Sequence, residues 1–450
     1  MKIRIVSILF LIVWILIQKV EAQSFVWESE PEDCDIPYVK IKETETGDFF
    51  AIGNNNCKVG CLKLNKYGNL IWSFSPKTLS RGLTDFISYD NDKTFYILGI
   101  GADFPSRSLL FKIDSKGQLI FEREVYSLTY FPLYFNDKLY KNKIVTCGYN
   151  FYPYPKLSPI LEFRSLLGDT LGKIELNDEK KLRAQRIFSS KIKSGFLMFC
   201  SDEGSAYLNI IQIDTSGTKV SNKWYGLGEY GYTTDFEDLM EKDSSYYLLA
   251  NLSFKNSSSG FERGTYIYKF NQNGDSIELK FLELNYTLKA IAPTNDNGFI
   301  VAGDVLIKLD SNYREEWRRE FKKNVRITSV AQSKDGGFYG AGSLFDETIN
   351  RNRTYIFKTD ANGHIDPSQN YPDILIYPNP VRDELKLELP FGEEFSISIF
   401  DLQGRKYLEF LTIGSTLISL KNMHEGVFLL VVKNSEGKVL KSVKLLKQKE

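Results

Sequence analysis

The chain has 450 residues, of which 42% are hydrophobic and 14% are aromatic, and its formal net charge at pH 7 is zero. This length accommodates two or three domains of ordinary size, and so many aromatic side chains favour β-structure. Because Lys and Arg are not in excess over Asp and Glu, the composition disfavours nucleic-acid binding.

The N-terminus has the organisation of a secretory signal peptide. Two positive charges precede an apolar run from Ile5 to Ile17, which has 13 residues. A membrane anchor needs about 20 apolar residues, so this run favours a cleaved signal. We expect residues 1–22 to be removed by cleavage between Ala22 and Gln23, and the mature chain to have no transmembrane segment.

Five cysteines lie outside the signal segment. Export permits disulfides, but an odd number of cysteines leaves at least one of them unpaired. Cys57 and Cys61 are close enough in sequence to pair across a local loop. Cys147 and Cys200 occupy matching apolar strand positions, where Cys behaves as a small hydrophobe. Because the chain has only two histidines, the sequence predicts no zinc site and no other metal or cofactor.

An apolar strand motif recurs through the middle of the chain. Each copy starts with an aromatic residue or Ile, and most copies end in Gly four residues later. The copies start 39 to 53 residues apart, at Phe49, Phe95, Ile144, Phe196, Tyr246, Phe299 and Phe338.

A second motif follows each copy of the first. It is an alternating strand, then Asp or Asn, two further residues and Gly, as in FKIDSKG ending at Gly117. Weaker copies end at Gly168 and Tyr313. Asp or Asn can cap its own turn and Gly supplies a positive φ, so the motif indicates a hairpin.

With two further strands, each repeat reads as four short antiparallel strands, which is typical of a propeller blade. The repeat resembles quinoprotein-type blades, in which an alternating strand, an Asp, a Gly turn and a docking Trp recur. Seven copies predict a seven-bladed β-propeller over residues 23–368. A β-helix or stacked sandwiches remain alternatives, although neither explains a four-strand period.

The seventh repeat lacks a fourth strand after Gly363. The segment from Phe25 to Ser29 resembles the fourth strand from Leu70 to Phe74, with Trp27 matching Trp72. We therefore expect this N-terminal segment to complete the last blade and close the ring, which would hide open sheet edges.

The connections between the second and third strands lie on one face and vary in length, as ligand-binding loops on rigid scaffolds often do. One of them is rich in rings that suit sugar stacking or protein anchoring. Its candidate ligand residues are Tyr149, Phe151, Tyr152 and Tyr154. The alternative is that these rings cover a neighbouring blade.

Acidic residues fall on the same connections, and glycoside hydrolysis uses two carboxyl groups across a sugar bond. They are Asp103, Asp202, Glu203, Asp304 and Asp346. Because no nucleophile elbow or phosphate-binding loop is present, no catalytic residue is assigned. We expect the propeller to bind a glycan, peptide or protein partner, with a secreted polysaccharide hydrolase or lyase as the alternative.

After a linker that contains Pro367 and Pro372, residues 369–450 hold seven short alternating strands. Seven strands in so short a segment predict a small Ig-like β-sandwich. The expected fold class is therefore all-β: a seven-bladed β-propeller followed by a small Ig-like β-sandwich.

Four motifs of this last segment occur together in a fixed order. They contain Tyr377, Pro378, Asn379 and Pro380, then Asp401, Gly404 and Arg405, then Gly426, and last Lys444 and Lys447. In order and spacing they resemble the type A C-terminal sorting domain of the bacterial type IX secretion system. The resemblance implies recognition by the outer-membrane secretion machinery, and release or surface attachment of the body. An ordinary Ig-like adhesion module is the alternative.

Overall fold

The computed structural model describes residues 24–28, 40–55, 58–76, 79–101, 108–125, 134–135, 140–150, 158–176, 182–190, 195–202, 207–226, 234–256, 260–282, 286–348, 350–365, 374–389, 394–434, 437 and 439–448. Within these ranges every regular element is a β-strand, and the strands form nine sheets. The signal segment and its cleavage site lie outside the described residues.

Contacts within the chain define two compact units. The first contains Glu28–Lys66 and Leu70–His364, and the second contains Ile365–Glu450 together with Gln23–Trp27 and Tyr67–Asn69. In the described part of the chain before residue 365, seven four-stranded sheets follow one another.

The first three sheets are antiparallel, and their strands follow the chain order. These strands are β2 (Lys40–Glu43), β3 (Phe49–Asn55), β4 (Lys58–Leu64) and β5 (Leu70–Phe74); β6 (Leu79–Tyr89), β7 (Thr94–Gly101), β8 (Ser108–Asp114) and β9 (Leu119–Val125); and β10 (Tyr134–Phe135), β11 (Ile144–Asn150), β12 (Ser158–Arg164) and β13 (Thr170–Glu175).

The next three sheets repeat this order, and the seventh takes its fourth strand from the N-terminus. The strands are β14 (Leu182–Ser189), β15 (Gly195–Asp202), β16 (Tyr207–Asp214) and β17 (Lys219–Gly226); β18 (Thr234–Lys242), β19 (Ser245–Asn256), β20 (Gly260–Phe270) and β21 (Ser276–Leu282); β22 (Leu288–Pro293), β23 (Phe299–Gly303), β24 (Val305–Leu309) and β25 (Glu315–Glu320); and β26 (Val325–Gln332), β27 (Phe338–Asp346), β28 (Arg351–Lys358) and β1 (Phe25–Glu28).

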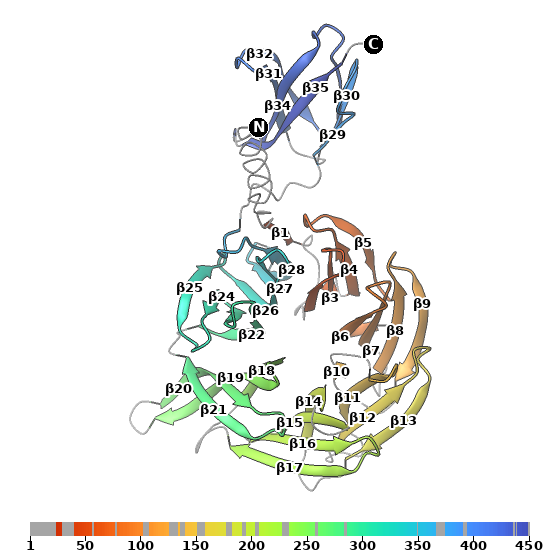
Figure 1. Ribbon diagram of the computed structural model, residues 1–450, viewed down its shortest axis with the longest axis vertical. Coiled ribbons are helices and arrows are strands. Elements are labelled where there is room, and N and C mark those ends of the chain that lie inside the picture. Colours follow the sequence, from red (N-terminus) through yellow and green to blue (C-terminus); the bar gives the residue numbers. More distant parts are fainter. Residues whose placement is uncertain are drawn as a thin grey trace, which may run out of the picture. The chain divides into compact units, whose positions relative to one another are not determined.

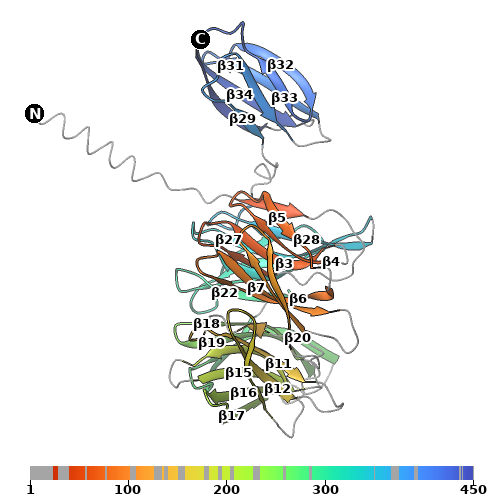
Figure 2. The same cartoon turned by 90° about the vertical axis from the view of Figure 1, so that its right-hand side faces the viewer.

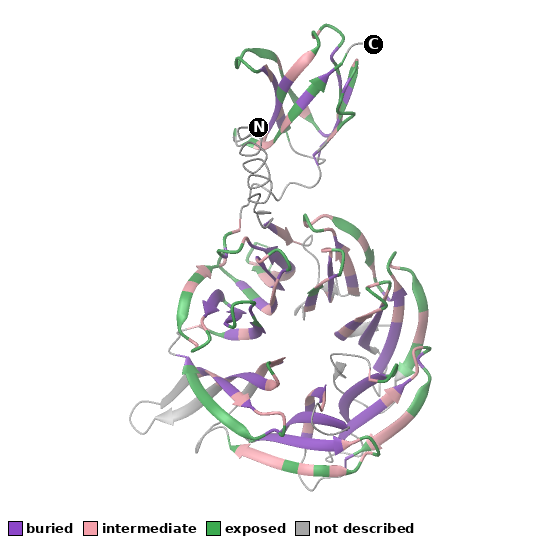
Figure 3. Cartoon of the chain, in the orientation of Figure 1, coloured by how far each residue is buried: buried purple, intermediate pink, exposed green. Residues whose placement is uncertain are grey.

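The seven sheets are arranged around a ring, with the first strand of each sheet toward the centre and the last strand outside (Figure 1). Figure 2 shows the same sheets from the side. Their middle strands are largely buried and most outer strands are exposed (Figure 3). The expected fold class, an all-β propeller followed by a small β-sandwich, is confirmed.

The Asp–X–X–Gly turns form as their sequence predicts. Oδ1 of Asp114 accepts hydrogen bonds from the backbone N–H groups of Lys116 at 2.9 Å and Gln118 at 2.8 Å. The same pair of bonds forms at Asp214, Asn271, Asp310 and Asp360. Each acidic or amide side chain thus holds the hairpin that joins the third and fourth strands of its sheet.

In five of the turns the glycine contacts a side chain from the outer strand of the preceding sheet. Gly117 has φ +81°, and a Cβ built on it would lie 2.6 Å from Cδ2 of Trp72. Nε1 of Trp72 also donates a hydrogen bond to the carbonyl oxygen of Ser115 at 2.9 Å. Only glycine leaves room for the indole at this position.

The same contact recurs around the ring with other side chains. The pairs are Phe121 with Gly168, Ile174 with Gly217, Trp317 with Gly363, and Phe25 with Gly68. In this last contact Phe25 has the place that Trp72 has at Gly117. The alignment made from the sequence, which matched Trp27 to Trp72, is therefore displaced by two residues.

The first and seventh sheets also contact each other through their inner strands. The backbone N–H of Glu43 donates to the hydroxyl oxygen of Tyr339 at 3.1 Å, and the Tyr339 ring lies 5.1 Å from that of Phe49. Oε2 of Glu43 accepts a hydrogen bond from the backbone N–H of Lys334 at 2.9 Å. These contacts close the ring.

Two lysines on third strands, the buried Lys308 and the half-buried Lys63, are paired with acidic residues within their own sheets. Nζ of Lys308 lies 2.8 Å from Oδ2 of Asp296, and Nζ of Lys63 lies 2.9 Å from Oδ2 of Asp48. Burial opposes the ionisation of Asp296, but hydrogen bonds from Lys308, Thr294 and the Gly298 backbone lower its pKa to about 2. These pairs permit a charged side chain in an apolar strand.

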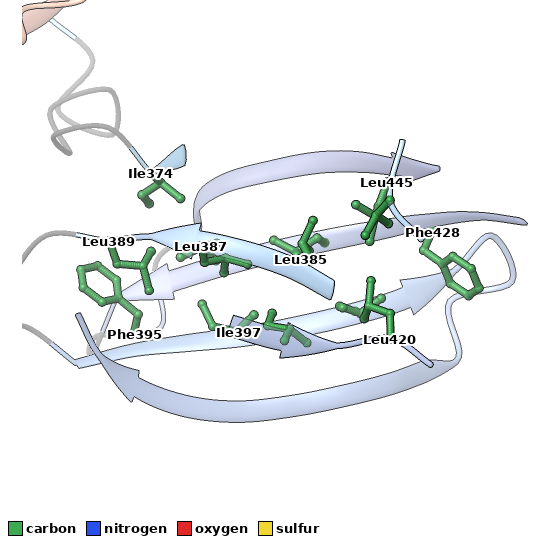
Figure 4. Close-up of a cluster of buried hydrophobic side chains, with 14 residues drawn as sticks. Ile374, Leu385, Leu387, Leu389, Phe395, Ile397, Leu420, Phe428 and Leu445 are labelled. Atoms are coloured by element: carbon green, nitrogen blue, oxygen red, sulfur yellow. The ribbon is translucent and has the colours of Figure 1, made fainter. Parts of the chain in front are cut away.

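The second unit is a two-sheet sandwich. Its strands are β29 (Leu375–Tyr377), β30 (Glu384–Glu388) and β33 (Thr416–Ser419) in one sheet, and β31 (Glu394–Asp401), β32 (Lys406–Ile413), β34 (Gly426–Asn434) and β35 (Val439–Lys447) in the other. Buried side chains from both sheets, among them Leu385, Ile397 and Phe428, form one core (Figure 4).

We predict that Gly117→Ala destabilises the propeller by about 2 to 4 kcal/mol, since it combines an unfavourable φ with a clash against Trp72. Urea denaturation followed by circular dichroism measures this loss. The matched control is Gly172→Ala, because a Cβ at Gly172 meets nothing within 4 Å. The control should remain within about 0.5 kcal/mol of the wild type; equal losses in both variants would contradict the prediction.

Candidate functional site

The first strands of the seven sheets carry residues at one equivalent position, opposite the fourth residue of the repeated apolar motif. In the described registers these residues are Lys40, Asp85, Tyr134, Arg186, Asp238, Ala290 and Ser329. Because equivalent strands line the centre of the ring (Figure 1), residues distant in sequence form one layer there.

A register shift precedes this position in five of the sheets. It lies at Leu83/Asp85, Ala184/Arg186, Phe236/Asp238, Leu288/Ala290 and Ile327/Ser329. A β-bulge leaves one residue unpaired and turns the following side chain. The repeated bulge therefore orients the residues of this layer in the same way in each of these sheets.

Charged side chains of the layer form an ion-pair network across four sheets, which we call the central charge cluster: Lys40, Asp85, Arg186 and Asp238. Nζ of Lys40 lies 2.7 Å from Oδ1 of Asp85. The two terminal nitrogens of Arg186 lie 3.6 Å from Oδ2 of Asp85 and 3.6 Å from Oδ1 of Asp238. A single guanidinium thus links carboxylates of the second and fifth sheets.

Backbone groups hold both carboxylates in place. Oδ1 of Asp85 accepts a hydrogen bond from the N–H of Phe86 at 2.9 Å. Oδ1 of Asp238 accepts one from the N–H of Leu239 at 2.9 Å, and its Oδ2 accepts one from the N–H of Ile291 at 3.0 Å. The bond to Ile291 joins the fifth sheet to the sixth.

A second ion pair lies beside the central charge cluster. Glu237, the bulge residue before Asp238, accepts hydrogen bonds on Oε1 from Lys289 at 2.6 Å and from Asn251 at 2.8 Å. Lys289 is itself the bulge residue of β22. The bulges therefore contribute charged side chains of their own.

The central charge cluster is only partly screened from solvent. The exposed side-chain fractions are 29% for Lys40, 9% for Asp85, 18% for Arg186 and 21% for Asp238. Burial and the neighbouring Arg186 lower the pKa of Lys40, while Asp85 acts in the opposite direction. The site therefore offers a polar ligand both hydrogen-bond donors and acceptors.

The aromatic candidates of the sequence are only partly described. Tyr149 lies in β11 and is buried, with the guanidinium carbon of Arg183 5.8 Å from its ring centre. Its ring packs inside the protein and is not presented on a surface loop. Phe151, Tyr152 and Tyr154 lie outside the described residues.

Three of the acidic candidates are described, and two of them pair with arginines. Asp304 lies 3.6 Å from Arg326, and Asp346 lies 2.5 Å from Arg353. Asp202 lies at the end of β15. Asp103 and Glu203 lie outside the described residues, as does Cys57, while Cys61 is a buried free thiol.

The central charge cluster was not predicted from the sequence, because its residues lie on the first strands of the sheets and not on the connections of variable length. A signal does exist in the sequence. A pair of residues that includes at least one polar side chain precedes an apolar residue at the same place in five repeats: Thr84-Asp85, Gln185-Arg186, Glu237-Asp238, Lys289-Ala290 and Thr328-Ser329.

The polar motifs of the C-terminal sandwich have local structural roles. Asn379 donates a hydrogen bond through Nδ2 to the carbonyl oxygen of Lys444 at 2.8 Å and accepts one on Oδ1 from the N–H of Leu446 at 3.0 Å. It thereby fixes the start of the sandwich to β35. The peptide bonds before Pro378 and Pro380 are both cis.

The turn at Asp401 and the exposed Lys444 agree with the sequence prediction, whereas Lys447 does not. Asp401 accepts hydrogen bonds from the N–H of Gln403 and from the N–H and Nε of Arg405, and Gly404 has φ +80°. Lys444 is exposed. Lys447, expected at a basic edge, is instead buried and lies 3.6 Å from Asp383.

No helix among the described residues is long and apolar enough to cross a membrane. The same residues contain no group of three or more His, Cys, Asp or Glu side chains that would hold a metal ion.

Residues 375–446 match the family described as secretion system C-terminal sorting domain. The chain therefore carries a type IX sorting domain behind a β-propeller, as the motifs at Tyr377, Asp401 and Gly426 predicted. A domain of this kind indicates export, followed by secretion or attachment to the cell surface, and it implies interaction with the type IX secretion machinery.

Among solved structures, the chain is similar to the WD40 domain of Pan2 from Neurospora crassa, at 12% identity and a TM-score of 0.48, covering 73% of this chain and 90% of that one. It is also similar to a prolyl endopeptidase, at 10% identity and a TM-score of 0.48, where the match covers 90% of this chain and 54% of that one. A third similar structure is prolyl oligopeptidase B from Galerina marginata, at 11% identity and a TM-score of 0.45, where the match covers 89% of this chain and 56% of that one. The comparison with curated proteins found no match.

We predict that Arg186→Met destabilises the propeller by about 1 to 3 kcal/mol, because Asp85 and Asp238 lose their shared partner in a half-buried site. Chemical denaturation measures the effect. Arg326→Met is the matched control, since Arg326 lies at the same 3.6 Å from Asp304 but is 59% exposed. The control should change the free energy of unfolding by less than about 0.5 kcal/mol. Equal losses in the two variants would show that the ion pairs of Arg186 contribute no more to stability than an exposed pair does.

Proposed function

We propose that this is an exported binding protein. Residues 1–22 direct it out of the cytoplasm, and residues 369–450 deliver it to the type IX machinery. The propeller of residues 23–368 then holds a glycan, peptide or protein partner at the cell surface or outside the cell. The sorting domain supports the export step, and the central charge cluster supports the binding step.

The contacts of the acidic groups favour binding over hydrolysis. A general acid of a glycosidase holds a proton before reaction, and an apolar pocket without a nearby cation favours that state. Asp85, Asp238 and Glu237 each contact a lysine or arginine instead. Such groups suit the binding of a polar ligand, which would replace one partner of an ion pair.

A polysaccharide hydrolase or lyase is the second candidate, and one observation favours it. Asp85 and Asp238 lie on either side of the same guanidinium, so two carboxylates are present at one position in the ring. A ligand that displaced Arg186 would meet both of them.

A binding assay separates the two candidates. We expect residues 23–368 to fold by themselves and to retain at least one ligand on a glycan array or a displayed-peptide library. Lys40→Ala should weaken that binding by about tenfold or more, as the loss of a charged hydrogen bond does. Lys323→Ala, which removes an exposed lysine, is the control.

Release of reducing ends from a polysaccharide would support the hydrolase, and unsaturated products would support the lyase. An array and library without any bound ligand would contradict the proposed binding.

The export step is tested in cells that have the type IX machinery. Deleting residues 369–450 should leave the folded propeller in the periplasm, since the address is lost while the body is complete. Cell fractionation and immunoblotting locate the protein, and full-length Gly172→Ala is the control. Normal appearance of the truncated chain outside the cell would contradict the role of the tail.

A further inference from the structure

The outer strand of the fifth sheet, β21, is an exposed apolar edge. It has one neighbour, β20, in the sheet order. Its residues from Ser276 to Phe281 are all exposed, and the exposed fractions are 54% for Ile277, 50% for Leu279 and 44% for Phe281. An edge strand of this kind presents backbone hydrogen-bonding groups beside apolar side chains, which favours pairing with another strand.

The alternation along β21 gathers its apolar side chains on one face. Leu279 and Phe281 are two residues apart, so they lie on the same side of the strand, and Ile277 is the exposed bulge residue that precedes them. The ring of Phe281 lies 5.0 Å from that of Tyr266, and a Cβ at Gly264 would lie 2.5 Å from Phe281 Cε2. The Phe281 ring thus lies flat against β20 and extends the row into an apolar stripe.

The outer strand of the sixth sheet shows how such an edge is usually protected. In β25 the charged residues already have partners within the chain, with Arg318 Nε 2.6 Å from Glu315 Oε1 and Lys308 Nζ 2.9 Å from Glu316 Oε2. Charged edge residues oppose strand addition. In β21 the only charged residues are Glu278 and Lys280, on the face opposite the stripe.

The sequence of β21 is complementary to itself in an antiparallel arrangement. A two-fold axis at Leu279 places Leu279 opposite its own copy and Glu278 opposite Lys280, with Phe281 next to the bulge residue Ile277 of the other copy. Each face of the joined sheet is then matched, because apolar residues meet apolar residues and each Glu278 meets a Lys280. Cross-strand pairs of both kinds stabilise sheets. The bulge at Ile277 ends the regular pairing.

We propose that two copies of this chain associate through β21 and join their fifth sheets into one continuous eight-stranded sheet. The arrangement is an isologous two-fold contact formed by strand addition. It places the two propellers side by side, so that two ring centres are presented by one assembly.

Charge reversal tests the register. Lys280→Glu places Glu278 opposite a glutamate twice in the dimer, and Glu278→Lys places two lysines opposite each other. We expect each variant of the mature full-length chain to raise the dimer dissociation constant by about tenfold or more in sedimentation equilibrium. The double exchange, Glu278→Lys with Lys280→Glu, restores opposite charges and should restore dimerisation.

The rescue distinguishes the proposal from a folding defect. Glu278 also accepts a hydrogen bond from the Tyr313 hydroxyl at 3.3 Å, whereas Lys280 is exposed, so Lys280→Glu is the cleaner single change. Glu320→Lys on β25 is the control and should leave the dimer unchanged. A wild-type chain that stays monomeric, or a double variant no better than the singles, would overturn the proposal.

Discussion

The contact between an outer-strand side chain and the turn glycine of the next sheet is the interaction on which the propeller depends. A four-stranded sheet buries both faces only between two neighbours, so the joints decide whether a ring forms. Trp72 on Gly117 shows the requirement most clearly, because the indole occupies the space of a missing Cβ. Different side chains meet the same need elsewhere. At the fifth turn the hydroxyl of Tyr225 donates to the carbonyl oxygen of Gly274 at 2.7 Å.

Repetition of this joint gives every sheet the same orientation, and the central charge cluster follows from that. Equivalent positions of the inner strands lie at one level, so Lys40, Asp85, Arg186 and Asp238 meet although almost 200 residues separate the first from the last. Bulges at matching places keep their side chains aligned. The pair of Arg186 with Asp85 joins the fourth and second sheets, which are not neighbours in the ring, so the cluster combines a structural role with a polar site.

Export sets different demands on the two units. The sandwich has its own buried core, and hydrogen bonds of Asn379 and Asp401 hold its entry segment and its turn. Outside the cell the propeller surface must also avoid unwanted pairing. The charged residues of β25 oppose such pairing. The exposed apolar side chains of β21 do not, and this difference suggests that β21 has a specific partner strand.

The amino-acid sequence by itself determined the strand repeat, the propeller class, the Asp–X–X–Gly hairpins and the sorting domain, because each depends on residues close together in the chain. Only the tertiary structure decided which residues meet at the centre of the ring, that Tyr149 and Lys447 are buried, and that Phe25 takes the place expected for Trp27. Those outcomes depend on packing between distant segments and on bulges that change strand register, and no local pattern encodes either with certainty.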